Sequence, residues 1–205
     1  RLEVNEAVRQ REAEAGTPWP RDPDGAPLYP GTCRGLSETK MQRRRAAGEP
    51  HVLRLAMDRA LAGIAGEPLS YRFFDESGEE RTVAVDPARW GDVVLARKDV
   101  PTSYHLSVVV DDAFQQITHV TRGEDLLPST HVHRLLQTLL KLPEPVYLHH
   151  PLVVDDTGKR LAKRHDSLAI AAMRESGTSP LEVLEKIQDP SVIRAITSLT
   201  TSSNG

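Results

Sequence analysis

Hydrophobic and polar residues along the chain follow two different periods, which decide where we expect helices and where we expect strands. Seven segments with helical spacing or helix-boundary residues predict helices: 2–15, 37–48, 103–116, 129–142, 167–176, 180–187 and 190–199. Six short runs rich in β-branched or aromatic residues predict strands: 51–57, 70–76, 81–86, 92–97, 117–122 and 146–150. Capping chemistry places the start of the second helix at Ser37 and that of the fourth at Ser129 or Thr130.

The order of these elements changes near Pro101. Upstream, the strands within 50–98 predict an irregular β-rich module with a hairpin tip at 75–80. From Pro101 onward helix, strand, helix and strand alternate, which is typical of an α/β fold with a parallel sheet. Three short helices then predict a small C-terminal helical subdomain. We therefore expect three parts, at 1–100, 101–153 and 154–205.

The composition narrows the class of protein. With 205 residues, 39% of them hydrophobic and 27% charged, the chain fits a globular protein of one large or two small domains. Its net charge of −3 does not indicate a nucleic-acid binder, and a single cysteine excludes a disulfide framework. No apolar run reaches the roughly 18 residues of a membrane span, and no signal peptide opens the chain, so we expect a cytoplasmic protein with no membrane partner. The start at Arg1, without Met, suggests a fragment.

The segment 16–36 is too rich in proline and glycine for a regular element, and its large side chains suggest that something organises it. It contains Tyr29 and Cys33, but two such ligands do not make a tetrahedral zinc site, so a small buried thiol is the simpler interpretation. The histidine pairs 131/133 and 149/150 have spacings that do not place both rings on one face, so we reject them as metal sites. The basic helix at 40–45 has two interpretations: it contacts the phosphate backbone of a nucleic acid, or it is a solvated surface.

Two further features suggest a site for an anionic substrate. The basic loop at 159–164 follows a predicted strand, where cations can stabilise a leaving pyrophosphate, although a solvated turn is the more common alternative. Arg122 ends another predicted strand, where ligands bind in open α/β sheets and where a guanidinium can hold a carboxylate in bidentate fashion. A structural ion pair of Arg122 with Glu124 or Asp125 is an equally good interpretation of that position.

Taken in order, these features resemble the catalytic domain of class I glutamyl-tRNA synthetases. The stretch SYHLSVVVDDAFQQITHVTRGEDLLPSTHVHRLLQ is followed further along by KRLAKR, and the latter looks like the KMSKS signature of that family, with the residues Arg160, Leu161, Ala162, Lys163 and Arg164. Short homologues called glutamyl-Q tRNA(Asp) synthetases are the most similar, through YPGTCRG at 29–35, WGDVVLARKD at 90–99 and THVHRLLQ at 130–137.

The resemblance implies a fold and a reaction. The fold is α/β, and residues 101–153 form the second half of a class I aminoacyl-tRNA synthetase Rossmann-type catalytic domain. Residues 1–100 form an inserted α+β zinc and acceptor-type module, and residues 154–205 form a KMSKS-like loop with a helical subdomain. The reaction is the ATP-dependent activation of glutamate to glutamyl-adenylate, followed by transfer to the queuosine base of tRNA(Asp). The cofactors implied are ATP, Mg²⁺ and Zn²⁺, the partners are glutamate and tRNA(Asp), and we expect a monomer.

The resemblance also assigns residues. Tyr104 and Arg122 match the residues that bind the glutamate substrate, and Lys163 matches the ATP-binding lysine of the KMSKS loop, with a catalytic role. Tyr29 and Cys33 match the last two ligands of a zinc site, which would explain how the proline- and glycine-rich segment is held.

Several family features are not found in this sequence. The HIGH motif, an arginine and a glutamate that hold the amino acid, and a Cys-x-Cys pair belong upstream of Arg1, so we expect that the chain alone neither activates glutamate nor binds zinc tightly. Ala162 replaces the usual serine, and Gln116 stands where glycine is common. Two alternatives to the glutamyl-Q function remain: a fragment of a conventional glutamyl-tRNA synthetase, and a non-catalytic RNA-binding remnant of a synthetase.

Overall fold

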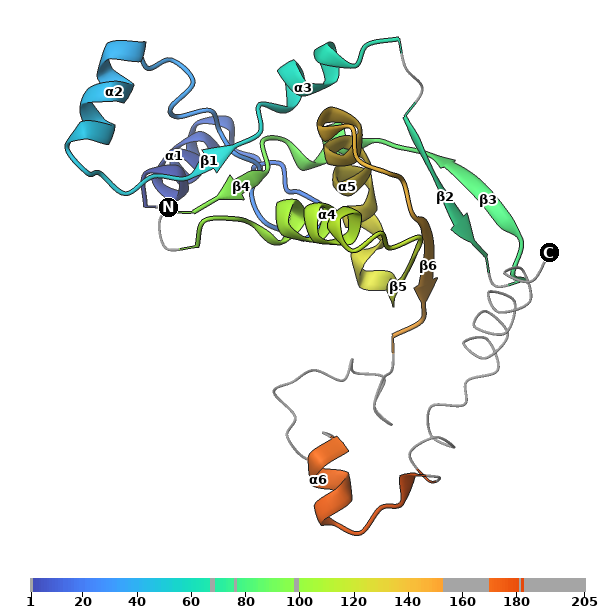
Figure 1. The fold of residues 1–205 in the computed structure, drawn as a ribbon. Coiled ribbons are helices and arrows are strands. Elements are labelled where there is room, and N and C mark those ends of the chain that lie inside the picture. The colour runs from blue at the N-terminus through green and yellow to red at the C-terminus, as the bar shows by residue number, and fades with distance from the viewer. Residues whose placement is uncertain are drawn as a thin grey trace. The chain divides into compact units, whose positions relative to one another are not determined.

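The computed structural model describes residues 2–66, 69–75, 77–97, 100–152, 170–180 and 182, and Figure 1 shows their helices and strands. The chain folds into two compact units, and each unit is made of segments that lie far apart in the sequence. The first unit comprises Arg1–Leu69, Ala84–Gln116 and Pro128–Pro143, and the second comprises Ser70–Val83, Ile117–Leu127 and Glu144–Gly205.

The first two helices of the first unit have the ends that the sequence predicts. Helix α1 (Leu2–Ala15) is followed by Gly16, whose φ of 66° is the left-handed conformation that glycine adopts most readily. Helix α2 (Glu38–Ala46) begins after Ser37, whose side chain accepts a 3.3 Å hydrogen bond from the N–H of Lys40. The predicted cap and the glycine stop are therefore confirmed.

A small antiparallel sheet follows these helices in the first unit. Strand β1 (Leu53–Arg54) pairs with β4 (Val94–Ala96), and the 3-10 helix η1 (Pro87–Trp90) precedes β4. Helix α3 (Met57–Gly63) lies in a segment that we had expected to be only β-rich. It is a single short helix, too brief for its periodicity to stand out, and its buried residues join the core of the unit.

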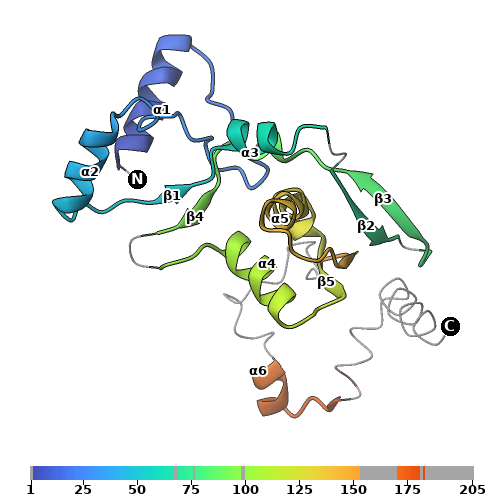
Figure 2. The same ribbon diagram turned by 45° about the horizontal axis from the view of Figure 1, so that its top comes forward.

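The core of the first unit combines side chains of α3 and η1 with those of α4 (Tyr104–Phe114) and α5 (Leu127–Leu140), two helices that lie side by side in Figures 1 and 2. The hydroxyl of Ser103 caps α4 by accepting a 3.4 Å hydrogen bond from the N–H of Leu106. Eight buried side chains make up this core: Met57, Ala60, Trp90, Val93, Val109, Val132, Leu135 and Leu136.

The expected start of α5 was wrong. The helix begins at Leu127, so Ser129 and Thr130 lie inside its first turns and are buried, with 2% and 0% of their surface exposed. The chain enters α5 directly from the 3-10 helix η2 (Glu124–Leu126), whose extended N-cap residue is Gly123 at the end of β5. Serine and threonine cap a helix only when their own backbone is outside the helix, and here Ser129 and Thr130 are already helical.

The second unit is built on a four-stranded sheet in the order β3-β2-β6-β5. Its strands are β2 (Ser70–Phe74), β3 (Glu80–Ala84), β5 (His119–Gly123) and β6 (Val146–His150). Both β2 and β5 pair with β6 in parallel, so the predicted parallel sheet is confirmed. The turn between β2 and β3 lies at the predicted hairpin tip, where the N–H groups of Glu79 and Ser77 donate to the Asp75 carboxylate.

Beyond residue 152 the structure describes only α6 (Ile170–Glu175) and the few residues after it, and α6 falls inside the helix predicted at 167–176. The predicted helices at 180–187 and 190–199 lie almost wholly outside the described residues, as does the basic loop. The part boundaries expected near residues 100 and 153 remain predictions.

Candidate functional site

Tyr104 is the first residue of α4 and lies in the first unit. Its ring contacts two imidazoles, with centroids 5.5 Å from that of His133 and 5.7 Å from that of His105. About half of the tyrosine, 49%, remains exposed, whereas His133 is 1% exposed. The phenol is therefore held against a buried imidazole while part of it stays open to a ligand.

The two histidines beside Tyr104 join three elements of the first unit. Nδ1 of His105 and Nε2 of His133 share a 3.1 Å hydrogen bond, which connects the first turn of α4 to α5. The centroids of the Trp90 and His105 rings lie 5.3 Å apart with the rings steeply inclined to each other, and Trp90 Nε1 donates to the carbonyl of Pro128. These contacts fix the start of α4, and with it the backbone that carries Tyr104.

His131, on the same helix as His133, has a different environment. Its Nδ1 accepts a 2.9 Å hydrogen bond from the N–H of Asp86, and burial, with Arg89 nearby, lowers the pKa of His131. His131 and His133 thus contact different partners. The sequence did not reveal the pairing of His133 with His105, because the two residues lie on separate helices.

Arg122 lies on β5 in the second unit, directly opposite His149 in the register with β6. Its Nε donates a 3.1 Å hydrogen bond to Nε2 of His149. Its guanidinium carbon lies 5.1 Å from the centroid of the Tyr147 ring, a cation–π contact, and Tyr147 is 2% exposed. Two side chains of β6 therefore contact the guanidinium of Arg122.

Burial and charge keep His149 neutral at physiological pH. Burial, together with the neighbouring guanidinium of Arg122, lowers the pKa of His149 to about 4. A neutral imidazole with Nε2 as acceptor carries its proton on Nδ1, so the observed hydrogen bond defines the tautomer. Burial also raises the pKa of Tyr71, whose ring meets that of Tyr147 edge to face.

A side chain at the position after Arg122 would have to displace the side chain of Asp125. A Cβ added at Gly123 would lie 2.5 Å from Oδ1 of Asp125 and 3.0 Å from Cδ2 of Leu152. The glycine thus lets the chain turn from β5 into η2 with Asp125 folded against it. This end of β5 and β6 is the carboxyl end of parallel strands, where open α/β sheets bind ligands, and an arginine there can bind a carboxylate.

Tyr29 and Cys33 lie close together in the first unit. The N–H of Cys33 donates a 2.7 Å hydrogen bond to the phenol oxygen of Tyr29, and the hydroxyl of Thr32 donates to the same oxygen at 3.3 Å. Cys33 is exposed, which corrects the alternative of a small buried thiol. The guanidinium carbon of Arg54 lies 4.6 Å from the centroid of the Tyr29 ring.

The same segment is fastened by an ion-pair network that the sequence did not reveal. Arg34 donates two hydrogen bonds to the buried carboxylate of Asp92, at 3.0 and 2.6 Å, and two more to Asp58, at 2.9 and 3.2 Å. The N–H of Met57 also donates to Asp92. These carboxylates raise the pKa of Arg34 and keep its charge fixed.

The donor set does not fit zinc by itself. A structural zinc site needs four ligands, and within the described ranges no group of three or more His, Cys, Asp or Glu side chains could hold a metal ion. Tyr29 and Cys33 supply two ligands, and the phenol oxygen already accepts two hydrogen bonds. Zinc is therefore not supported by the residues seen here.

The loop residues Arg160, Leu161, Ala162, Lys163 and Arg164 lie outside the described residues. Tyr104 and Arg122 belong to different units.

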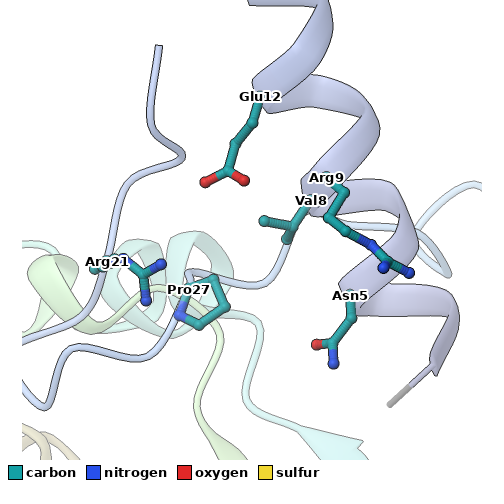
Figure 3. A pocket seen from close by; sticks show the side chains of 6 residues that line it. All are labelled: Asn5, Val8, Arg9, Glu12, Arg21 and Pro27. Carbon is teal, nitrogen blue, oxygen red and sulfur yellow. The ribbon is translucent and has the colours of Figure 1, made fainter.

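An open hollow of about 420 Å³ lies between α1 and the turn at 21–27 in the first unit, as Figure 3 shows. Six residues line it: Asn5, Val8, Arg9, Glu12, Arg21 and Pro27. Glu12 and Arg21 are tied to backbone groups of Trp19 and Gly25, so this hollow reflects the packing of α1.

An α/β arrangement with parallel strands, an arginine at their carboxyl end and a tyrosine at a helix start is consistent with the catalytic domain of a class I aminoacyl-tRNA synthetase. The match to the family described as tRNA synthetases class I (E and Q), catalytic domain, extends over residues 5–191. The chain belongs to this family.

Individual relatives of the chain carry the names of glutamate-specific synthetases. The chain is 47% identical to the glutamyl-Q tRNA(Asp) synthetase of Rhodobacter capsulatus over 167 residues, which are 80% of this chain and 57% of that protein. It is 42% identical to the protein of the same name from Nocardia farcinica, over 88% of this chain and 53% of that protein. It is 34% identical to glutamate–tRNA ligase 2 of Alkalilimnicola ehrlichii, over 85% of this chain and 35% of that protein.

A solved structure shares the fold. The crystal structure of glutamate-tRNA synthetase from Elizabethkingia anophelis matches with a TM-score of 0.55 and 24% identity, over 83% of this chain and 32% of that chain. The chain spans about half the length of the glutamyl-Q relatives that it matches. Within the part of the chain that the structure describes, no helix is both long and apolar enough to cross a membrane.

Proposed function

We propose that the full-length protein containing this chain activates glutamate with ATP and transfers it to the queuosine base of tRNA(Asp). The observation that carries the proposal is the 47% identity to a glutamyl-Q tRNA(Asp) synthetase across 80% of the chain. The alternative of a conventional glutamyl-tRNA synthetase rests on more distant relatives, at 34% identity. We place the protein in the cytoplasm, acting as a monomer.

The proposed chemistry has two steps. An oxygen of the glutamate α-carboxylate attacks the α-phosphorus of ATP, a phosphorus–oxygen bond breaks, and pyrophosphate leaves with its electron pair. A nucleophilic group of the RNA then attacks the carbonyl carbon of the adenylate, the bond from that carbon to the phosphate oxygen breaks, AMP leaves with the electron pair, and the proton of the nucleophile is lost to solvent. Class I synthetases use ATP and Mg²⁺, and the magnesium ion accompanies the nucleotide as part of the substrate.

Three residues have proposed roles in the first step. Arg122 pairs with a carboxylate of glutamate, which suits the planar fork of a guanidinium at the carboxyl end of β5. Tyr104 hydrogen-bonds the amino acid through its partly exposed phenol. Lys163, in the loop of residues 160–164, neutralises the ATP phosphates as pyrophosphate leaves.

The finer organisation also belongs to this proposal. Residues 1–100 contain the proposed module for the acceptor RNA together with β2 and β3, which join the sheet of β5 and β6. Residues 101–153 contribute the second half of the catalytic domain, and 154–205 form the KMSKS-like loop and helical subdomain. In a longer protein, Tyr29 and Cys33 would need two further ligands to hold zinc, and no step of the reaction depends on that metal.

The test is glutamate-dependent exchange of pyrophosphate into ATP by the full-length protein in the absence of tRNA. We expect exchange in the wild type and its near-complete loss in Lys163→Ala, a drop of at least about 100-fold if the lysine stabilises the transition state. Exchange that requires tRNA would favour the conventional synthetase. No exchange with or without tRNA would indicate a non-catalytic RNA-binding protein.

A further inference from the structure

The guanidinium of Arg122 is restrained from the neighbouring strand in two independent ways. Nε2 of His149 accepts the Nε–H of Arg122 at 3.1 Å, which fixes the rotation of the guanidinium within its own plane. The ring of Tyr147, 5.1 Å from the guanidinium carbon, limits the tilt of that plane. Both partners come from β6, which pairs directly with β5, so the restraints belong to the sheet itself.

Bidentate recognition of a carboxylate depends on this kind of restraint. The two N–H···O bonds form only when guanidinium and carboxylate are close to coplanar, and an unrestrained arginine side chain loses rotamer freedom when it binds. A guanidinium has five N–H donors, and the bond to His149 uses the one on Nε. A carboxylate that binds Arg122 in bidentate fashion through the two terminal nitrogens therefore does not compete for the bond to His149.

We infer that His149 is a positioning residue that orients the guanidinium of Arg122 for the carboxylate of the amino-acid substrate. The inference rests on the proposed function, because it takes glutamate as the ligand of Arg122. His149 acts through Arg122 and does not itself contact the substrate.

The chemistry of His149 suits this role. The low pKa of its imidazole means that Nε2 is available as an acceptor throughout the pH range of an enzyme assay. The ring of Tyr147, with its centroid 6.1 Å from that of His149 and nearly parallel to it, supports the imidazole on one side. A glutamine at the same position can present an amide oxygen to Nε of Arg122, whereas alanine cannot.

The neighbouring residue provides a matched control. His150 lies on the same strand, is partly buried like His149, and donates from Nδ1 to the carbonyl of Pro151 at 2.8 Å. His150 has no role in the proposed site. Replacing it by alanine removes a histidine of the same strand without touching the contact between His149 and Arg122.

The experiment measures pyrophosphate exchange by the full-length protein with glutamate and ATP varied separately. In His149→Ala we expect the KM for glutamate to rise about 10- to 100-fold, the range typical of lost outer-shell partners, while the KM for ATP stays within about twofold. His149→Gln should recover most of the affinity for glutamate, and His150→Ala should behave like the wild type. The Nε–H resonance of Arg122 should be protected from solvent exchange in the wild type and in His149→Gln, and lost in His149→Ala.

The outcomes separate this inference from the proposed function. Normal exchange by the wild type, combined with equal changes in both KM values or with no recovery in His149→Gln, overturns the positioning role and leaves the proposed function intact. An Arg122 Nε–H signal unchanged in His149→Ala also overturns it. Absence of exchange in the wild type overturns the proposed function, and the role of His149 toward glutamate with it.

Discussion

Gln116 has a backbone conformation that glycine adopts freely and that is costly for a longer side chain such as glutamine. Its φ is 56°, in the left-handed region, immediately after the end of α4. A side chain in this conformation costs about 1 kcal/mol or more, because Cβ approaches the following carbonyl oxygen. This strain gives a physical reason for the glycine that is common here among the proteins the chain resembles.

Replacing Gln116 by glycine should therefore stabilise the protein. We expect Gln116→Gly to raise the free energy of unfolding by about 0.5 kcal/mol, since the relieved strain exceeds the extra entropy that glycine gives the unfolded chain. Urea unfolding followed by circular dichroism would measure the change. Gln116→Ala keeps the strain, so a stabilisation of the same size in the alanine variant would contradict this account.

At the scale of single residues, the family resemblance assigns expected roles to residues but does not indicate the partners that position them. Tyr104 and Arg122 could be named because a motif assigns them. The contacts of Tyr104 with His133 and of Arg122 with His149 depend on which helix or strand packs beside which. Nothing in the local sequence of a residue encodes such a partner, and His149 was considered only as a possible metal ligand.

The segment 16–36 illustrates the same limit for a whole element. Its proline and glycine content predicted a loop that something else must organise. The structure supplies that organisation through Arg34, which joins the loop to the buried carboxylate of Asp92 and to Asp58 on α3. A bidentate arginine with a buried partner is a strong restraint, because its loss leaves the carboxylate without its main counter-charge.

We predict that Arg34→Ala lowers the free energy of unfolding by about 2 kcal/mol, less than for a fully buried pair because Arg34 is partly exposed. The free energy of unfolding of Arg34→Lys should lie between those of the wild type and Arg34→Ala, since lysine keeps the positive charge but cannot form bidentate hydrogen bonds. Cys33→Ser, next in the chain and exposed, should change stability by less than about 0.5 kcal/mol. Thermal unfolding of the three variants tests this ranking, and equal losses in Cys33→Ser and Arg34→Ala would show that the thiol matters as much as the ion pairs.

Among the described elements, those with strong periodicity or clear caps were predictable. Helices α1, α2 and α4 and strands β5 and β6 lie where the sequence places them. Helix α3 was missed, because seven residues give too little periodicity, and the start of α5 was misplaced, because η2 delivers an already helical backbone. In both cases packing and the preceding backbone outweighed local propensity.

At the scale of the molecule, the order of strands in the second unit could not be predicted. The sequence indicated a parallel sheet for β5 and β6, but β2 and β3 were assigned to a separate β-rich module. The structure pairs Phe73 of β2 with Tyr147 of β6, residues far apart in the chain. Such pairing is set by tertiary packing and register, which a local hydrophobic pattern does not specify.

The half-buried His149 of this sheet should make the stability of the protein sensitive to acid. His149 has a pKa of about 4 when folded, well below its ordinary value near 6.5. Above pH 6.5 both the folded and the unfolded forms are neutral, and the stability is fully present. Between about 6.5 and 4 only the unfolded form gains a proton, so the free energy of unfolding falls with pH, and the loss is complete below the folded pKa.

The contribution of His149 can be isolated by comparing two pH values in two proteins. From pH 7 to pH 5 we expect the wild type to lose about 1 kcal/mol more than His149→Gln, an estimate discounted by about half because the imidazole is partly exposed. His131, whose pKa is also lowered by burial, contributes equally to both proteins and cancels in the difference. Urea unfolding at the two pH values measures how much free energy of unfolding each protein loses. His150→Gln is the control for removing a histidine from the same strand. A wild type and His149→Gln that lose the same stability would mean that the folded imidazole is already protonated at pH 5, and Nε2 could then not accept the hydrogen bond from Arg122 at that pH.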